Sequence, residues 1–369
     1  MVEEPVVAAS LIAWLAFALG LVFGYVGNRS SFCTMGAVSD IVNMGDWTRM
    51  RMWMLAIGVA ILGTAALRLG GWFDPSSTIY GGTRLMWLSH LTGGALFGVG
   101  MTLASGCGSK TLIRIGGGNL KSLIVFVFMG LAAYMTLRGL FGTWRVAWLD
   151  PVALQLGSAQ DLPSLLTSFG LARESAILGA AAAIGGGLLV FGLASREARE
   201  AETLAGGLVI GALTVAGWYV TAHIGYVAEH PLTLEPAFIG TNSGRAESFS
   251  FVAPVAYTLE LLMLWSDTTR IVTFGIAGSL GLVVGSAVYA LTSRTFRIES
   301  FNSADDLVRH LVGATLMGFG GVTALGCTIG QGVSGFSTLA LGSLLTTASI
   351  IAGAAATMKV QYWLMMREA

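Results

Sequence analysis

Charged residues are scarce in this chain. They make up 11% of its 369 residues, and 54% of the residues are hydrophobic. Soluble domains carry about 25% charged residues, so this composition lacks the polar surface that a soluble protein of this size needs. Basic and acidic residues balance at 20 each, which leaves no basic excess for binding nucleic acid. The composition therefore predicts a membrane protein whose surroundings are lipid and which has no nucleic-acid partner.

Cysteine and proline are scarce as well, at three and seven residues. An odd number of cysteines cannot form a closed set of disulfides. The sequence has no Cys-x-x-Cys pair and no His/Cys cluster of the kind that binds a metal. It also lacks a nucleotide-binding loop, which argues against ATP-driven activity within this chain. We therefore expect no metal and no other cofactor.

Long apolar stretches dominate what is present, together with 51 glycines. A membrane-spanning helix needs about 20 mostly apolar residues. Nine stretches qualify: 7–27, 50–69, 87–105, 120–137, 175–194, 204–226, 268–291, 307–325 and 336–357. Four shorter apolar stretches lie between them, at 30–44, 106–116, 246–264 and 326–333, and such segments are tolerated at membrane depth where they line a cavity. The predicted fold is an all-α polytopic membrane protein with about nine transmembrane helices and about four short re-entrant helices.

The clearest pattern is an internal repeat. Residues 90–107 match residues 310–327 at nine of 18 positions, including the first His, a Gly-x-Gly and the final Gly-Cys. The two copies fall on the third and eighth spans, which cross the membrane in opposite directions. The sequence therefore predicts an inverted-topology repeat. We divide the chain into a first repeat (1–145), an outer loop with a connecting helix (146–202) and a second, inverted repeat (203–369).

Lysine and arginine indicate the orientation, since cytoplasmic loops carry an excess of both. With the N-terminus outside, thirteen of these residues fall on the inner face and seven on the outer face. The longest loop, 146–172, contains no basic residue. The first five residues include two glutamates and no basic residue, so we expect the first apolar run to be retained as a span. These patterns predict an outside N-terminus and a cytoplasmic C-terminus.

Two cysteines occupy the same position in the repeat. The pairs Gly106-Cys107 and Gly326-Cys327 fall where their spans are predicted to break. A lone cysteine in an apolar helix is more often a small packing residue, but two at matched breaks favour a shared site. Inverted repeats place such sites near the bilayer midplane, at broken helices.

The third cysteine has no counterpart in the second half. Cys33 lies in Asn-Arg-Ser-Ser-Phe-Cys-Thr-Met-Gly-Ala, residues 28–37, where the first span ends and a short helix begins. We expect Asn28, Ser30 or Ser31 to cap that helix, with Cys33 in its first turn. The free amide groups at the starts of short helices favour an anion, and a thiol adds a weak donor. The predicted site comprises the thiols of Cys33, Cys107 and Cys327, with Gly106, Gly326, Ser31, Thr34 and Thr328 in support.

Three motifs carry a family resemblance: residues 28–37 followed by Asp40, Gly-Val-Gly-Met-Thr-Leu-Ala-Ser-Gly-Cys at 98–107, and Gly-Phe-Gly-Gly-Val-Thr-Ala-Leu-Gly-Cys at 318–327. With them the chain resembles the YeeE/YedE family of bacterial inner-membrane proteins. The resemblance implies nine spans with extra short helices and an inverted repeat. It also implies uptake of thiosulfate along three cysteine thiols, and a TusA-like sulfur-carrier protein as a partner on the cytoplasmic side. Asn28, where the thiosulfate branch usually has Gln, and the long loop 146–172 leave the cargo open, and other branches are linked to selenium compounds.

Three functions stay open at this stage. The first is a transporter or channel for thiosulfate or a related sulfur-containing anion, which is not an enzyme. The second is a membrane sulfur-transfer protein whose cysteines form persulfides. The third is a non-specific pore or structural membrane protein. Carboxylates that could couple transport to protons are few, with Asp40, Glu260 and Asp267 the nearest candidates.

Overall fold

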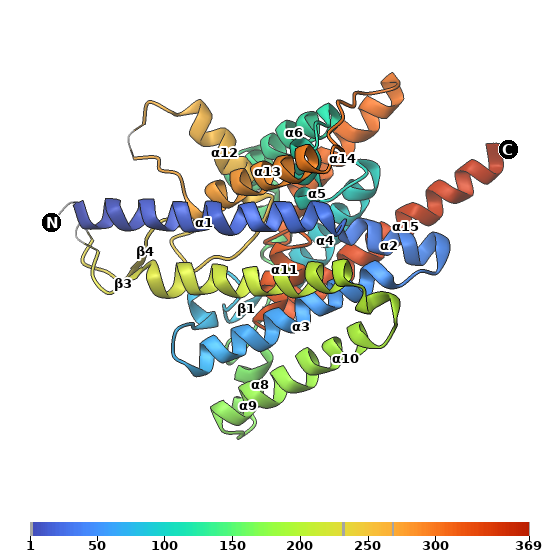
Figure 1. Ribbon diagram of the computed structural model, residues 1–369. Coiled ribbons are helices and arrows are strands. Elements are labelled where there is room, and N and C mark those ends of the chain that lie inside the picture. Colours follow the sequence, from blue (N-terminus) through green and yellow to red (C-terminus); the bar gives the residue numbers. More distant parts are fainter. Residues whose placement is uncertain (1–2, 231–232, 268, 369) are drawn as a thin grey trace.

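The computed structural model describes residues 3–230, 233–267 and 269–368, and long helices dominate them (Figure 1). The helices of the first half are α1 (Glu3–Arg29), α2 (Thr34–Met44), α3 (Thr48–Leu69), α4 (Trp87–Leu103), α5 (Gly108–Gly116), α6 (Leu120–Arg138) and α7 (Leu140–Trp144). The connecting part contains α8 (Leu162–Ser168), α9 (Arg173–Ala180), η3 (Ala181–Gly186), α10 (Gly187–Leu193) and η4 (Glu197–Arg199). The second half contains α11 (Ala201–Tyr219), η5 (Val220–Ile224), α12 (Ala253–Met263), α13 (Phe274–Thr292), α14 (Ala304–Thr323), η6 (Gly330–Gly335) and α15 (Leu341–Glu368).

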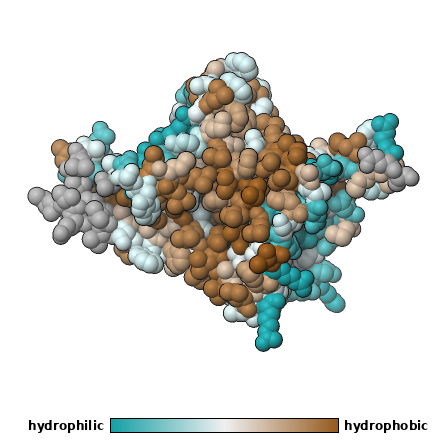
Figure 2. All heavy atoms as spheres, turned by 90° about the horizontal axis from the view of Figure 1, so that it is seen from above, coloured by the Kyte–Doolittle hydropathy of each residue, from teal (hydrophilic) through white to brown (hydrophobic). Residues whose placement is uncertain are grey.

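The structure confirms an all-α polytopic membrane fold. Eight helical segments in the described part of the chain are long and apolar enough to cross a membrane. Figure 2 shows an apolar area across the middle of one face, with hydrophilic residues toward both ends. The beginning of α1 and the end of α15 lie at opposite ends of the molecule (Figure 1). An apolar belt between two polar ends is the surface that a bilayer requires.

The predicted eighth span, 307–325, forms a long helix but does not meet the criteria for a membrane span. It corresponds to α14, whose 20 residues include Asp305, Asp306 and Arg309 in the first turns. These charges lower the hydropathy of the helix, although about 20 residues give it the length to cross the hydrocarbon layer. Nine stretches were expected, and eight spans plus the more polar α14 are found among the described residues.

The four short segments are confirmed as elements that interrupt the long helices. They appear as α2, α5, α12 and the π-helix η6. Strands in the described residues are confined to two short antiparallel pairs, β1 (Arg84–Leu85) with β2 (Leu154–Gln155) and β3 (Tyr226–Val227) with β4 (Ala237–Phe238). The remaining elements are the single turn η1 (Pro75–Ser77) and the π-helix η2 (Arg145–Leu149). An α-helix satisfies its backbone hydrogen bonds within its own segment, as lipid requires, which explains why the described residues contain so few strands.

The two repeat helices, α4 and α14, pack against each other in opposite directions. A Cβ atom on Gly93 would lie 2.6 Å from the backbone N of Ala324, whereas one on Gly100 would lie 2.6 Å from the carbonyl oxygen of Gly313. A Cβ on Gly313 would in turn lie 2.7 Å from the backbone N of Ala104. The contacts are therefore reciprocal at matched positions of the repeat. Glycine is required at this crossing because the two backbones touch.

Candidate functional site

Each cysteine follows a break between a long helix and a shorter helical segment. Two residues before each cysteine the chain adopts a left-handed conformation, with φ of 52° at Ser31, 56° at Ser105 and 60° at Leu325. Residues other than glycine rarely adopt this conformation, and it costs on the order of 1–3 kcal/mol each. The three breaks therefore share one backbone geometry that turns the chain sharply before each thiol.

Cys33 lies at the start of α2, but as its N-cap rather than in its first turn. Its Sγ accepts a hydrogen bond from the backbone N–H of Gly36 at 3.3 Å. The expectation that Asn28, Ser30 or Ser31 caps this helix was wrong. The left-handed turn at Ser31 places those residues in the break and brings the cysteine itself to the capping position.

Cys107 is the N-cap of α5 and neighbours the thiol of Cys33. Its Sγ lies 3.3 Å from the hydroxyl oxygen of Ser109. The side chain of Thr328 also lies beside this thiol. The first and second halves of the chain therefore meet at Cys107.

Cys327 occupies the matching break of the second half. Its Sγ accepts hydrogen bonds from the backbone N–H groups of Phe251 at 3.3 Å and of Gly330 at 3.4 Å. The hydroxyl oxygen of Ser250 lies 4.0 Å away. All three cysteines are free and buried. The structure thus brings together in the protein interior thiols that lie up to 294 positions apart in the sequence.

The other predicted site residues lie around these thiols. Gly106 packs near Lys110, and Gly326 has a φ of 158° beside Gln331, so its backbone is extended. Ser31 forms the turn before Cys33. Thr34 and Thr328 are buried. The Thr34 hydroxyl has no hydrogen-bond partner among the described residues, whereas the Thr328 side chain hydrogen-bonds the Cys107 thiol. No group of three metal-binding side chains occurs in the described part of the chain.

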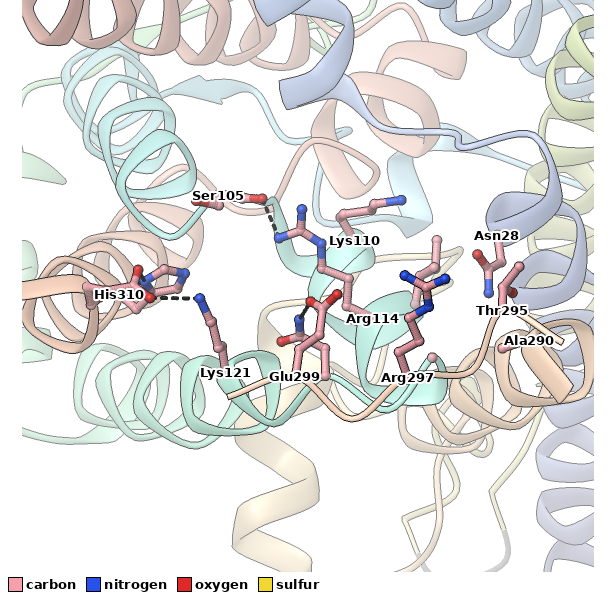
Figure 3. A pocket seen from close by; sticks show the side chains of 14 residues that line it. Asn28, Ser105, Lys110, Arg114, Lys121, Ala290, Thr295, Arg297, Glu299 and His310 are labelled. Carbon is pink, nitrogen blue, oxygen red and sulfur yellow. Dashed lines mark hydrogen bonds and ion pairs between the residues drawn. The ribbon is translucent and has the colours of Figure 1, made fainter. Parts of the chain in front are cut away.

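A large polar cavity is lined by residues of the first break and of α5 (Figure 3). Its volume is about 520 Å³, and Ser105 of the first break contributes to its wall. Basic side chains outnumber acidic ones in this wall, with Lys110, Arg114, Lys121 and Arg297 facing Glu299 and Asp306. We call it the basic cavity. A concave wall with this charge balance concentrates anions.

A second, smaller cavity lies at the other break. It has a volume of about 180 Å³, and Leu325 and Gly326 contribute to its wall, together with Tyr80 and Glu247. Burial raises the pKa of the Glu247 carboxyl above its ordinary value, while a hydrogen bond from Ser243 opposes this shift. Ser105 and Leu325 are equivalent in the repeat, and because α4 and α14 pack in opposite directions, the two cavities lie at opposite ends of this helix pair.

Lys110 is a site residue that the sequence analysis missed. It belongs to α5, lies close to both Cys33 and Cys107, and lines the basic cavity. The side-chain amine of Lys110 has no hydrogen bond or ion pair in the described residues, whereas that of Lys121 in the same wall pairs with Asp306 at 2.7 Å. Its spacing of three residues from Cys107 could have identified it, because residues three apart share a face of a helix.

The candidate carboxylates for proton coupling are engaged with cations. Glu260 is buried and lies 3.1 Å from Arg270 and 3.5 Å from Arg138. Asp40 pairs with Arg49, and Asp267 lies 3.4 Å from Arg270. Each of these three carboxylates therefore belongs to an ion pair in this structure.

The sequence is similar to known transport proteins over most of its length. It is 27% identical over 325 residues to a protein of Escherichia coli strain K12 named thiosulfate transporter TsuA, covering 85% of this chain and 84% of that protein. It is 24% identical over 348 residues to the protein of the same name from Spirochaeta thermophila, covering 92% and 96%. Residues 29–356 match the family described as Sulphur transport, and the chain therefore belongs to that family.

Proposed function

We propose that this protein takes up thiosulfate, or a closely related sulfur-containing anion, through the bacterial inner membrane. One observation carries the proposal: three free, buried thiols follow helix breaks, and the matched break residues Ser105 and Leu325 line two cavities at opposite ends of the α4 and α14 pair. Family membership and the names of the two relatives support the cargo. The chain acts as a transporter or channel and not as an enzyme.

The lining suits a soft anion that must enter and leave. A thiol offers a polarizable sulfur and a weak S–H donor, so it can contact the cargo without holding it tightly. Conduction requires binding that is favourable but weak enough for release. In this proposal Lys110 attracts the anion to the basic cavity, and Cys33, Cys107 and Cys327 line its passage through the centre.

We orient the chain with its N-terminus outside, so that the basic cavity faces the cytoplasm. This agrees with the basic residues of its wall, which belong to the more basic face. A sulfur carrier of the TusA type could then receive the cargo at this cavity.

We also propose that the chain consists of two repeats and a connecting part. The reciprocal contacts of α4 and α14 support this division.

Uptake of labelled thiosulfate into vesicles containing only the purified protein tests the proposal. We expect uptake in the wild type and its loss, by about tenfold or more, when any one of the three cysteines is changed to Ala, because a donor to the anion disappears. Changing all three to Ser separates two mechanisms. A hydroxyl keeps a donor but forms no persulfide, so residual transport supports passage and excludes the persulfide alternative.

A wild-type protein that takes up no sulfur-containing anion would contradict the proposal. The matched control is Ser158→Ala, a substitution in the loop between β2 and α8, remote in sequence from the three breaks. Trapping a persulfide on Cys107 or Cys327 during turnover would favour the sulfur-transfer alternative.

A further inference from the structure

Four buried polar side chains near the thiols line one narrow space, and three of them, Thr34, Trp53 and Thr347, have no hydrogen-bond partner in the described residues. The four are Thr34, Trp53, Thr328 and Thr347, and none exposes more than 6% of its surface. They come from α2, α3, the break after α14, and α15. A buried donor without a partner costs about 1–3 kcal/mol. Three such groups in one place, beside a fourth hydroxyl on Thr328 that contacts the Cys107 thiol, indicate that something accepts their hydrogen bonds during function.

The position of this space relates it to the cysteines. Thr34 follows Cys33 directly, and Thr328 follows Cys327. Thr328 also neighbours the Cys107 thiol. Through Thr34 and Thr328, the space therefore adjoins all three thiols. Trp53 and Thr347 also line it, although they lie far from every cysteine in the sequence.

The chemistry of the lining indicates an acceptor as the ligand. The indole N–H of Trp53 can only donate, and the threonine hydroxyls can each donate one hydrogen bond. The remaining lining is Gly332, Ile350 and Ile351, so the wall contains no charged group. Neutral donors stabilise an anion without the strong attraction that would trap it.

We propose that Thr34, Trp53, Thr328 and Thr347 form a donor site for the oxygen atoms of an oxyanion, next to the thiols that contact its sulfur. The inference rests on the proposed function and adds how the cargo is recognised. An anion with an oxygen-bearing end and a sulfur end, such as thiosulfate, matches a site with hydroxyl and indole donors at one side and thiols at the other. The space is too narrow for a water molecule in this structure, so the ligand must separate its walls on binding.

Kinetics of thiosulfate uptake into vesicles test the site. Trp53→Phe removes the N–H together with one ring of the indole, and Thr347→Val replaces a hydroxyl with a methyl group without loss of volume. We expect each to raise the apparent KM about tenfold or more, because a hydrogen bond to a charged ligand is lost. Thr347→Ser restores the hydroxyl and should restore the wild-type KM.

The matched control is Thr136→Val, since Thr136 is buried on α6 and its hydroxyl donates to the carbonyl oxygen of Ala132. Stabilisation of the purified protein by thiosulfate in a thermal melt gives a second readout, expected in the wild type and in Thr136→Val and reduced in Trp53→Phe and Thr347→Val. Wild-type KM values in both Trp53→Phe and Thr347→Val would overturn the donor site while leaving the transport function intact. Absence of uptake by the wild type would instead refute the transport function itself.

Discussion

At the scale of single residues, the backbone conformation before each cysteine is the distinctive feature. Ser31, Ser105 and Leu325 all take the left-handed conformation that residues other than glycine avoid. Such strain persists only where the surrounding structure enforces it, and it gathers at functional sites. Here it reverses the chain after a long helix and allows Cys33 and Cys107 to cap the next one. The position of each thiol is therefore fixed by backbone rather than by side-chain packing alone.

Lys110 provides the clearest residue-scale prediction. We expect Lys110→Gln to lower thiosulfate uptake at least about tenfold, because an unpaired cation beside the path contributes a Coulombic attraction of several kcal/mol in a poorly solvated site. Lys110→Arg keeps the charge and should retain most of the uptake. Initial rates in vesicles, with the exposed Lys359→Gln as control, measure the difference. Equal rates in Lys110→Gln and the wild type would show that Lys110 does not attract the cargo.

At the scale of elements, close backbone contact explains the abundance of glycine. A Cβ atom on Gly20 of α1 would lie within 2.2 Å of the Gly278 carbonyl oxygen of α13. The same holds between α3 and α11, where a Cβ on Gly211 would lie 2.5 Å from the Ala56 carbonyl oxygen. Lipid tails are as apolar as leucine, so packing rather than the hydrophobic effect holds membrane helices together. Small residues at the crossings thus determine which helices can be neighbours.

Gly100 tests this packing. A Cβ there would lie 2.6 Å from the Gly313 carbonyl oxygen and 2.8 Å from the Met317 backbone N. We expect Gly100→Val to destabilise the protein by about 1–3 kcal/mol or more, because neither backbone can give way without separating α4 from α14. A lower midpoint of thermal aggregation in detergent would show it. Gly187→Val is the control, since nothing lies within 4 Å of a Cβ at Gly187, and an equal loss there would contradict the argument.

At the scale of the whole molecule, two matched breaks meet at one centre from opposite directions. Because α4 and α14 pack in reverse order, Ser105 opens onto the basic cavity and its counterpart Leu325 onto the smaller one. In the proposed function, each cavity serves one side of the membrane. Since the second repeat lacks a counterpart of Cys33, the set of thiols is asymmetric, with two from the first half and one from the second.

Orientation is a prediction about the whole molecule that labelling can check. We expect Gly157→Cys, in the loop between β2 and α8, to react in intact cells with a thiol reagent that does not cross the membrane. Arg196→Cys, in the turn between α10 and η4, should react only after the cells are opened. Both positions are exposed, and the three native cysteines are at least 94% buried and should add little background. The reverse labelling pattern would place the basic cavity outside.

The sequence alone determined the class of this protein, because long apolar stretches and scarce charge leave only a membrane environment for the chain. It also revealed the repeat and the matched positions of Cys107 and Cys327, since both follow from order along the chain. It could not show that Cys33 caps its helix, since this depends on the left-handed turn at Ser31.

The tertiary structure alone decided which residues share the centre. Trp53 and Thr347 join the threonines after Cys33 and Cys327 only because α3 and α15 pack beside the breaks, and Lys110 reaches two thiols only because α2 and α5 begin side by side. Local propensity and hydropathy specify where helices form. They cannot specify contacts between residues hundreds of positions apart, which arise when glycine-lined backbones pack together in the membrane.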